Sequence, residues 1–456
     1  MDADGCSQSQ LDDDGDGVMN DADDCPLTPT VEAVDDDGCA PSQLDDDNDG
    51  VMNDADDCPL TPTGEVVDAD GCHGGSVVTW GDSYSGGNSS SESSNLSSGV
   101  IQIYSANYAF AALKSDGSVV TWGNVWQGGN SSSVSSNLSS GVTQIFSTNY
   151  AFAALKSDGS VVTWGGSGGD SSSVSSNLSS GVTHIYSNPN VFAALKGDGS
   201  VVTWGSSSSG GDSSSVSSDL SFGVTQIFSN SNAFAALKSD GSVVTWGLSY
   251  HGGDSSSVSS DLSSGVTGIF STSYAFAALK SDGSVVTWGH TDNGGDSSSV
   301  SSDLSSGVTD IFSTNGLYPR SGAFAALKSD GSVVTWGHAD YGGDSSSVSS
   351  DLSSGVTDIF STRNGAFAAL KSDGSVVTWG SSSDGGDSSS VSSVLSSGVT
   401  HIFSTGSAFA ALKSDGSVVT WGSSSDGGDS SSVSTDLSYG VTQIFSTNDA
   451  FAAIIG

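Results

Sequence analysis

One motif, Thr-Trp-Gly, constrains the fold more than any other feature, because it recurs nine times at intervals of 40–48 residues, most often 42. A period of that length is typical of repeat architectures in which one small unit cannot bury its apolar face alone and packs against its neighbours. The chain is therefore expected to fold as a row of similar units, although 456 residues would otherwise suggest several unrelated domains. The nine tryptophans are Trp80, Trp122, Trp164, Trp204, Trp246, Trp288, Trp336, Trp379 and Trp421.

Each repeat contains three β-prone runs. In the first complete copy, residues 109–113 (AFAAL) and 118–122 (SVVTW) are joined by Lys-Ser-Asp-Gly, and Asp-Gly between two such runs signals a hairpin. Residues 141–146 read as a third strand, anchored by Val142 and Ile145 around a slight irregularity. We expect the small alanines at a crowded inner strand near a propeller axis. The serine tract between these runs is interpreted as an edge strand or a tight loop.

These repeats resemble those of regulator of chromosome condensation, and most closely the compact bacterial form of roughly 40 residues, which includes a secreted β-lactamase inhibitor. The resemblance covers residues 75–456 and implies an all-β propeller, but it implies no activity, because propellers host unrelated functions. The chain departs from the family in having nine repeats where seven are usual, and in lacking the common histidine before the alanine strand. The matching residues of the first complete copy are Leu113, Gly117, Val119, Trp122, Gly123, Gly128, Val142 and Ile145.

The two ends of the repeat region complement each other. Residues 450–456 form an alanine strand without its Thr-Trp-Gly partner, and residues 76–81 form a Thr-Trp-Gly strand without its alanine partner. Pairing them satisfies two exposed strand edges at once, so the sequence predicts a nine-bladed β-propeller closed by its N- and C-terminal strands. The same complementarity between molecules would build a strand-swapped filament, and that alternative stays open.

The N-terminal segment is built on a different principle. Residues 1–72 hold 23 of the 52 acidic residues, none of the 10 Lys and Arg, and all five cysteines. Such a segment cannot fold by apolar burial, so it is organised by cations or remains disordered. Clustered cysteines in a small region without a core indicate disulfides and an extracellular location. The domains are therefore residues 1–74 and 75–456. No apolar run is long enough to span a membrane, and the acidity argues against a nucleic-acid partner.

Two nearly identical segments, beginning at Leu11 and Leu44, each space oxygen ligands as a calcium loop does. Carboxylates fall at positions 1, 3 and 5, glycine at 6, a backbone carbonyl at 7, an amide at 9 and a carboxylate at 12. Asp at position 12 and the lack of flanking helices argue against an EF-hand. The predicted ligands of Ca²⁺ are Asp12, Asp14, Asp16, Val18, Asn20 and Asp23 in the first loop, and Asp45, Asp47, Asp49, Val51, Asn53 and Asp56 in the second.

With the Cys-Pro-x-Thr-Pro and Val-Asp-x-x-Gly-Cys sequences that follow, these segments resemble thrombospondin type 3 repeats, which implies a calcium-ordered, rod-like stalk. Pairing Cys25 with Cys39 and Cys58 with Cys72 closes the metal-free half of each repeat and leaves Cys6 over. We therefore expect that the chain begins within a repeat and that the partner of Cys6 lies upstream. The rival pairing, Cys6–Cys25 and Cys39–Cys58, leaves Cys72 over and is less favoured, but spacing alone does not exclude it.

The repeats offer little catalytic chemistry. All eight lysines occupy one repeat position, which indicates a structural role such as pairing with the turn aspartate or with an adjacent blade. The six histidines show no metal-ligand spacing, and no nucleophile elbow or Cys–His pair occurs. We therefore expect no enzyme. The variable patches suit recognition because loops on a rigid scaffold carry function. The predicted contact residues are Trp126, Tyr318, Arg320 and Arg363, although tolerated loop variation explains them equally well.

Five Asn-x-Ser sequons mark the early repeats as glycosylation sites if the source cell glycosylates: Asn88, Asn95, Asn130, Asn137 and Asn177. The leading hypothesis is a non-enzymatic extracellular protein with a structural or adhesive role, a building block of a cell-surface appendage, fibre or matrix. Its partners would be other copies of itself, surface or matrix proteins, or glycans. The alternative is a soluble inhibitor-type propeller that binds a protein through one loop face, and a propeller enzyme ranks third.

Overall fold

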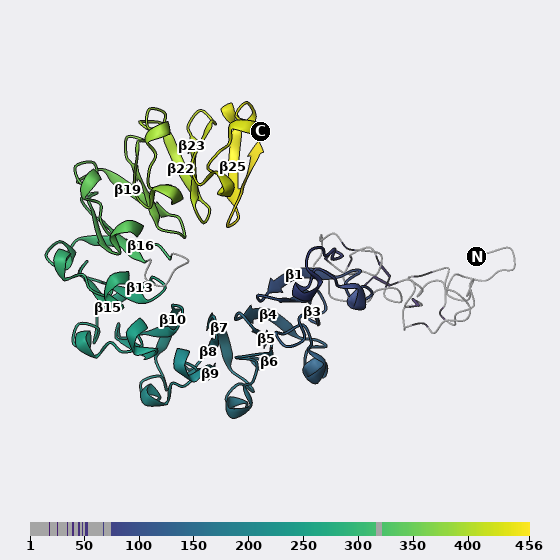
Figure 1. Ribbon diagram of the computed structural model, residues 1–456. Coiled ribbons are helices and arrows are strands. Elements are labelled where there is room, and N and C mark those ends of the chain that lie inside the picture. The colour runs from purple at the N-terminus through teal and green to yellow at the C-terminus, as the bar shows by residue number, and fades with distance from the viewer. Residues whose placement is uncertain are drawn as a thin grey trace, which may run out of the picture. The chain divides into compact units, whose positions relative to one another are not determined.

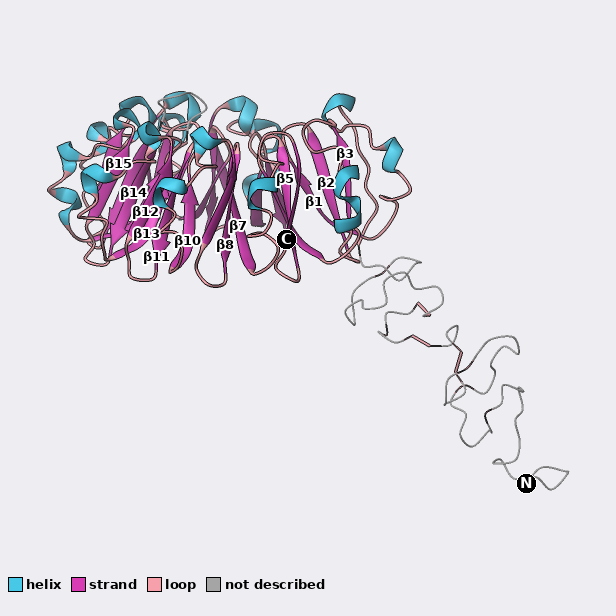
Figure 2. Ribbon diagram, turned by 90° about the horizontal axis from the view of Figure 1, so that it is seen from below, coloured by secondary structure: helices cyan, strands magenta, loops and turns pink. Residues whose placement is uncertain are grey.

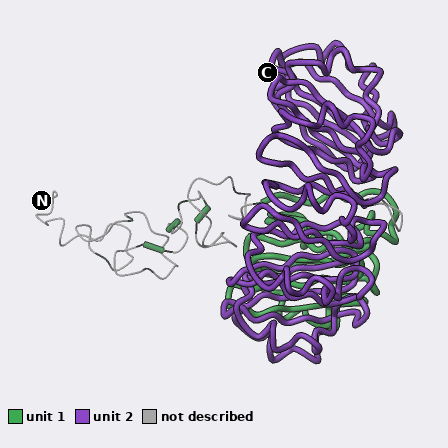
Figure 3. Tube along the Cα trace, turned by 90° about the vertical axis from the view of Figure 1, so that its left-hand side faces the viewer, with its two compact units in different colours: residues 1–170 green, residues 171–456 purple. Residues whose placement is uncertain are grey.

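The computed structural model describes residues 74–315 and 322–456, together with Val18, Cys25, Val34, Cys39, Ala40, Leu44, Asp45, Asn48, Val51, Met52 and Val67. The chain divides into two compact units, residues 1–170 and 171–456, and each is described by itself (Figure 3). The domain boundary predicted near residue 74 concerns the stalk and stays a prediction.

Every described blade is a small antiparallel sheet in chain order, and the described residues form eight three-stranded sheets and one two-stranded sheet. The first unit holds β1 (Val100–Ser105), β2 (Ala109–Lys114), β3 (Val119–Gly123), β4 (Val142–Ser147), β5 (Ala151–Lys156) and β6 (Val161–Gly165). The second holds β7 (Val182–Asn188), β8 (Val191–Lys196), β9 (Val201–Gly205), β10 (Val224–Ser229), β11 (Ala233–Lys238), β12 (Val243–Gly247), β13 (Val266–Ser271), β14 (Ala275–Lys280), β15 (Val285–Gly289), β16 (Val308–Ser313), β17 (Ala323–Lys328), β18 (Val333–Gly337), β19 (Val356–Ser361), β20 (Ala366–Lys371), β21 (Val376–Gly380), β22 (Val399–Ser404), β23 (Ala408–Lys413), β24 (Val418–Gly422), β25 (Val441–Ser446) and β26 (Phe451–Ile455).

Short 3-10 turns connect the blades. In the first unit they are η3 (Ser83–Ser85), η4 (Ser90–Glu92) and η5 (Ser132–Asn137). In the second they are η6 (Ser172–Val174), η7 (Ser207–Ser209), η8 (Ser214–Val216), η9 (Ser249–His251), η10 (Ser256–Val258), η11 (Thr291–Asn293), η12 (Ser298–Val300), η13 (Asp303–Ser305), η14 (Ala339–Tyr341), η15 (Ser346–Val348), η16 (Ser382–Asp384), η17 (Ser389–Val391), η18 (Ser424–Asp426), η19 (Ser431–Val433) and η20 (Asp436–Ser438). Figure 2 shows them gathered toward one end of the strands.

The blade containing β10, β11 and β12 shows why the repeat folds as it does. The β11–β12 hairpin closes where the Lys238 amide donates to the Ser242 carbonyl at 2.9 Å, and Gly241 takes the positive φ of 76° that the turn requires. The β10–β11 pairing shifts register between Val224 and Gln226, which confirms the predicted irregularity. The hairpin of β11 and β12 and the irregular strand β10 therefore form as the sequence predicts.

The alanine strand is the middle strand of each three-stranded blade, so its predicted place as the innermost strand is wrong. The sheet order in this blade is β10–β11–β12, and the first strand lies along the inner side of the row in the second unit (Figure 1). A ladder of serines joins successive first strands: Ser271 Oγ donates to the carbonyl of Ser229 at 3.1 Å, and Ser313 Oγ to that of Ser271 at 2.8 Å. Alternate alanines of β11 belong to the interblade clusters on the two sides of the sheet, Ala236 to one and Ala233 and Ala235 to the other.

The core consists of separate clusters, each lying between two neighbouring blades. In one cluster Ala233, Ala235 and Leu237 of one blade meet apolar residues of the next, among them Phe276 and Trp288. The rings of Phe276 and Trp288 are stacked at 5.3 Å, and both side chains are buried. Every blade therefore needs a neighbour to cover its face, as the repeat period implies.

The serine tract is a loop, in agreement with the second of its two predicted forms. Leu262 is buried and anchors the loop, and Lys280 Nζ donates to the carbonyl of Asp261 at 2.7 Å. The equivalent lysines Lys156, Lys196, Lys238, Lys328, Lys371 and Lys413 make the same contact at their own loops. The repeated lysine thus has a structural role, although its hydrogen-bond partner is a backbone carbonyl, and not the turn aspartate.

Candidate functional site

Each three-stranded blade has two variable patches. One follows the end of the third strand, and the other precedes the start of the middle strand, so both lie at the same end of the sheet. In the second unit η9 follows β12, and it ends at Gly252, whose φ of +93° lets its amide donate back to the Ser249 carbonyl at 3.1 Å. The antiparallel pairing places Ala233 opposite Gly247, which brings both variable patches of a blade to this end. These loops form the face on which the sequence predicts recognition.

Four rings from two adjacent repeats gather on this face, and we call Tyr250, His251, Tyr274 and His290 the Tyr250 cluster. The ring centroids of His251 and Tyr274 are 4.0 Å apart, and those of Tyr250 and His290 are 4.4 Å apart in an edge-on arrangement. Tyr250 is 60% exposed, whereas His290 is only 3% exposed. The cluster therefore presents a tyrosine to solvent on a support of packed histidines.

The histidines of the cluster hold their rings in place by local hydrogen bonds. His290 Nδ1 accepts the Asp292 amide at 3.2 Å, and His251 Nδ1 lies 3.1 Å from Asn232 Nδ2. Burial lowers the pKa of His251 below its usual value, and the nearby His290 lowers it further. The neutral imidazole of His251 is thus favoured, and the four rings form an aromatic surface suited to stacking on a ligand or partner.

The predicted contact residues are only partly within the described residues. Trp126 is 79% exposed, in the turn after β3, where its amide donates to Asn124 Oδ1 at 2.9 Å. Arg363 is exposed between β19 and β20, and its carbonyl accepts the amide of Asn315 at 3.1 Å. Tyr318 and Arg320 lie outside the described residues, so a joint site with Arg363 stays a prediction.

Sequence reasoning missed two residues of this face. His290 belongs to a variable loop expected to be exposed, but it is buried beneath Tyr250, which contacts it from the preceding repeat. Tyr274 was not singled out, although it stands next to Ala275 at the position where Tyr108 and Tyr150 stand in earlier repeats. A recurring tyrosine immediately before the alanine strand is the signal that points to it.

Aspartates of the hairpin turns accept hydrogen bonds from serines of the same turns. Asp282 Oδ1 accepts both the amide and the hydroxyl of Ser284, and these bonds lower the pKa of the Asp282 carboxyl. His184 and His401 are exposed on first strands. Among residues 74–315 and 322–456 and the isolated positions before them, no three His, Cys, Asp or Glu residues stand together as metal ligands would. The non-enzymatic character of the chain stays a prediction.

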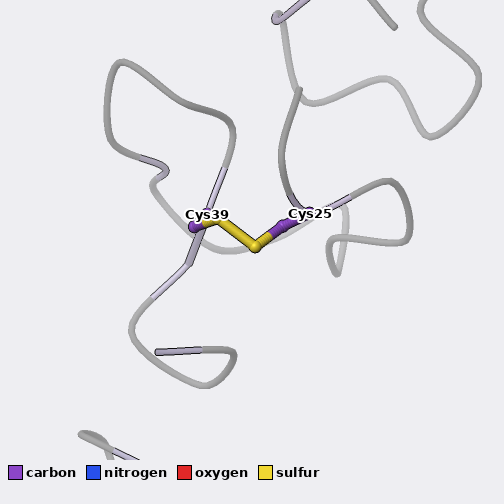
Figure 4. Close-up of a disulfide and its surroundings, with 2 residues drawn as sticks. All are labelled: Cys25 and Cys39. Atoms are coloured by element: carbon purple, nitrogen blue, oxygen red, sulfur yellow. A yellow bond between two sulfur atoms is a disulfide. The ribbon is translucent and has the colours of Figure 1, made fainter. Parts of the chain in front are cut away.

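The structure describes only a few residues of the stalk. Cys25 is bonded to Cys39, with their Cα atoms 5.1 Å apart (Figure 4). That bond agrees with the favoured pairing and excludes the rival one, because both rival disulfides need one of these two cysteines. Cys6, Cys58 and Cys72 lie outside the described residues.

Of the predicted calcium ligands, the structure describes Val18, Asp45 and Val51. The others lie outside the described residues: Asp12, Asp14, Asp16, Asn20, Asp23, Asp47, Asp49, Asn53 and Asp56. The donor chemistry of the two loops fits calcium, since every predicted ligand atom is a carboxylate, amide or carbonyl oxygen.

All five sequon asparagines are exposed: Asn88, Asn95, Asn130, Asn137 and Asn177. Asn130 Oδ1 accepts the Ser132 amide at 2.9 Å, and in a later repeat Asp254 Oδ1 accepts the Ser256 amide at the same distance. Asn and Asp are therefore interchangeable in this turn, which explains how the sequon is lost in later repeats. The attachment of sugars stays a prediction.

At the two ends of the repeat region the described residues leave a sheet incomplete: β26 pairs only with β25, and residues 76–81 form no strand. Trp80 is 84% exposed, while the equivalent Trp122 and Trp421 are buried. Beside β26 lies an apolar groove of about 380 Å³, lined by Ala410, Val418, Leu437, Ile444, Phe451 and Ala453, among others.

Of the described residues, none belongs to a helix long and apolar enough to cross a membrane.

Comparison with known proteins identifies the N-terminal segment. The model of the thrombospondin type 3 repeat matches residues 2–33 and 36–64. No curated protein matches the chain. The N-terminal segment therefore consists of thrombospondin type 3 repeats, as its ligand spacing and cysteines predicted.

Solved structures similar to the chain include natural and designed proteins. Prp20p of Saccharomyces cerevisiae, the yeast RCC1, is 16% identical over 53% of this chain and 72% of its own, with a TM-score of 0.30. The designed protein Ika8 is 15% identical over 71% of this chain and 96% of its own, with a TM-score of 0.27. The ectodomain of the Physcomitrella patens receptor kinase CR4 is 13% identical over 60% and 70%, with a TM-score of 0.29.

Proposed function

We propose that this chain is a non-enzymatic extracellular repeat protein with a structural or adhesive role, a building block of a cell-surface appendage, fibre or matrix. The observation that carries the proposal is the match of two thrombospondin type 3 repeats to segments that each keep a twelve-residue register of calcium ligands. The disulfide between Cys25 and Cys39 fits an oxidising compartment.

Calcium supplies the stiffness of the stalk in this proposal. Residues 1–72 contain 23 acidic side chains and no Lys or Arg, so without cations their mutual repulsion opposes a compact form. Ions bound at the two loops neutralise part of that charge, and their binding free energy is then folding free energy for a segment without a core. The Cys25–Cys39 bond limits the freedom of the metal-free half.

The repeat region serves as a rigid platform at the end of this stalk. We infer that its nine blades close into a ring through pairing of the N- and C-terminal strands. Each described interblade cluster contains the same kinds of side chain, so an uncovered blade at either end would leave apolar surface in water. Closure removes both open edges.

A second function, a soluble propeller that binds a protein partner through one loop face, is favoured by the Tyr250 cluster. Exposed tyrosine and tryptophan side chains on a fixed scaffold are frequent anchors of protein interfaces. Tyr250 and Trp126 both meet that description. A compact monomer that binds one protein ligand tightly, and loses that binding in the Tyr250→Ala variant, would support this function over the structural one.

The test of the leading function is imaging and limited proteolysis of the purified chain with calcium and with a chelator. With calcium we expect a stalk of constant length that resists protease, and with chelator one of variable length that protease cleaves. Asp45→Asn with Asp56→Asn should reproduce the chelator result for the second loop alone, while Asp292→Asn, on the loop face, serves as the matched control. A stalk whose length and protease resistance are unchanged by chelation would contradict the proposal.

A further inference from the structure

The third strand forms the outer edge of a three-stranded blade in the second unit. Figure 1 shows this order from the inner side outward as β7, β8 and β9, and the next sheet is ordered β10–β11–β12. Blades of β-propellers typically have four strands. Among the described residues no further strand pairs with β12. The place of a fourth, outer strand is therefore open in this blade.

The hydrogen bonds of the β11–β12 hairpin determine which peptide groups of β12 face outward. The Lys238 amide donates to the Ser242 carbonyl at 2.9 Å, so these two residues form a hydrogen-bonded pair. Bonded and non-bonded pairs alternate along an antiparallel ladder. In the register of this hairpin, Val243 and Thr245 fall at non-bonded positions and turn their amides and carbonyls away from β11.

The chain itself covers only part of this outer edge. The Val243 amide donates to the Leu262 carbonyl at 3.0 Å, and Thr245 Oγ1 lies 2.9 Å from Ser255 Oγ. Both partners belong to the serine tract that follows the blade. Thr245 is 8% exposed, yet within the described part of the chain its backbone amide and the Val243 carbonyl have no hydrogen-bond partner on this side. The edge is thus held at two points and left unpaired between them.

A groove of about 630 Å³ lies along this edge, and it is lined by residues 242–247. Ser215 and Val216 of the preceding serine tract line it as well, together with Ser255 and Ser256 of the tract that follows. A second groove, of about 690 Å³, has the same construction along β15. The arrangement therefore repeats from one blade to the next, and both volumes suit a short stretch of extended chain.

The charges of the two grooves indicate what kind of segment fits them. The groove along β12 contains Lys238, whose Nζ already donates to the carbonyl of Asp219 at 2.8 Å. An excess of carboxylates favours an occupant that carries Lys or Arg. A second copy of this chain, with its formal charge of −42, is disfavoured. Each groove has three carboxylates and one lysine: Asp212, Asp219, Asp254 and Lys238 along β12, and Asp261, Asp282, Asp296 and Lys280 along β15.

We propose that the groove along β12 is a docking site for an extended, Lys- or Arg-bearing segment of another protein, which adds to the sheet as a fourth strand. The Val243 carbonyl and the Thr245 amide supply backbone hydrogen bonds to that segment, and the carboxylates of Asp212 and Asp254 attract its cationic side chains. The groove along β15 offers the same site one blade further on, so a partner with several such segments binds several blades at once. This inference goes beyond the proposed function and requires neither calcium nor a closed ring.

The first test measures binding of fluorescent peptides to the full chain by anisotropy. The peptide KTVTVTK should bind, whereas ETVTVTE should bind at least about tenfold more weakly, because the groove carboxylates repel it. A KTVTVTK peptide N-methylated on two consecutive residues keeps its charge but loses a backbone donor in either register, so it should bind at least about fivefold more weakly. No binding of KTVTVTK, or equal affinity for it and for either of the other peptides, would overturn the proposal.

The second test locates the site by hydrogen exchange read by mass spectrometry. Bound KTVTVTK should slow amide exchange in residues 243–247 at least about fivefold. Asp212→Asn with Asp254→Asn should remove that protection, while residues 285–289 of the neighbouring blade keep it as an internal control. The variant should fold, because Asn130 occupies the same turn position in an earlier repeat.

Three outcomes of the exchange experiment would contradict the proposal. One is that residues 243–247 gain no protection from the peptide, and another is that their protection survives the double substitution. The third is protection that rises with protein concentration in the absence of peptide, which would identify a second copy of this chain as the occupant. None of these readouts involves the stalk, so this docking site and the calcium-dependent stiffness can fail separately.

Discussion

The indole nitrogen of Trp288 lies 3.0 Å from the carbonyl oxygen of Gly252, to which it donates a hydrogen bond across two successive repeats. The same bond joins Trp246 to Gly210 and Trp336 to Gly294. The tryptophan of one Thr-Trp-Gly motif and the double glycine that follows the preceding Thr-Trp-Gly motif therefore form one contact. That relation explains why both recur together through the chain.

Trp288→Phe tests the polar part of this contact. The ring still fills most of the space, but the buried carbonyl of Gly252 loses its donor, which costs about 1–3 kcal/mol of unfolding free energy. Chemical denaturation monitored by circular dichroism measures the loss. Trp126→Phe should change stability by no more than about 0.5 kcal/mol, because Trp126 is exposed. An equally small effect at Trp288 would show that its hydrogen bond contributes nothing.

Gly252→Ala tests the steric part. Gly252 has φ +93°, and a Cβ there would lie 2.7 Å from Phe276 Cδ2, so the substitution should cost roughly 1–3 kcal/mol. Gly268→Ala is the control, since its Cβ would lie 3.4 Å from Phe270 and other repeats carry Gln or His at that position. Thermal unfolding should separate the two variants, and equal melting temperatures would contradict the steric argument.

The turn aspartates should make the free energy of unfolding depend on pH below the ordinary pKa of an aspartate. Hydrogen bonds from the serine two positions further on, first from its hydroxyl and then from its amide, lower the pKa of Asp240, Asp282 and Asp330 below 3.8 in the folded state. Their stabilising effect is thus present above that value and is lost as the pH falls through the lowered pKa. Replacing all three by Asn should lower the melting temperature at neutral pH, and the difference from the unmodified chain should shrink as the pH falls through the lowered pKa.

The control for this prediction removes the hydroxyl and keeps the carboxylate. Ser242→Ala, Ser284→Ala and Ser332→Ala should reduce the pH-dependent difference, because the side-chain bond is the largest cause of each lowered pKa. The three Ser→Ala variants keep every carboxylate, so comparing them with the unmodified chain at each pH holds the net charge nearly constant. A difference that stays constant from neutral to acidic pH would contradict the assignment.

Removing the Cys25–Cys39 disulfide should affect the stalk alone. Cys25→Ser with Cys39→Ser frees a loop with a sequence separation of 14, which costs about 3 kcal/mol in the chain-entropy description. We expect weaker calcium binding by calorimetry and faster proteolysis before residue 74. The melting temperature of the repeat region should not change, and a matching fall in it would show that the two parts depend on each other.

Local chemistry made much of the blade predictable. Asp240 and Gly241 determine a tight turn by themselves, so the hairpin of β11 and β12 follows from a few neighbouring residues. Which strand of the sheet lies beside the first strand of the next blade depends instead on contacts between blades, such as the serine ladder. Serine at position 229 gives no hint of that, because its partners are 42 residues away.

The loop face was predictable as a place, but not in its details. Variation after each Thr-Trp-Gly motif indicated a surface free of core packing, and the exposure of Tyr250 agrees with that. The burial of His290 depends on Tyr250 and on the hydrogen bond from the Asp292 amide, which no pattern within one repeat encodes. Contacts between different repeats were thus the part that sequence reasoning could not supply.

The serine ladder has a direction. Ser271 gives its hydroxyl hydrogen to Ser229 and offers its own carbonyl to Ser313, which in turn receives the hydroxyl of Ser361. These rungs share one direction, so deleting or duplicating a repeat among them leaves a donor facing an acceptor at the new junction. The inner edge therefore tolerates changes in blade number, and a gene that gains or loses a repeat by unequal recombination yields a chain whose joints still fit.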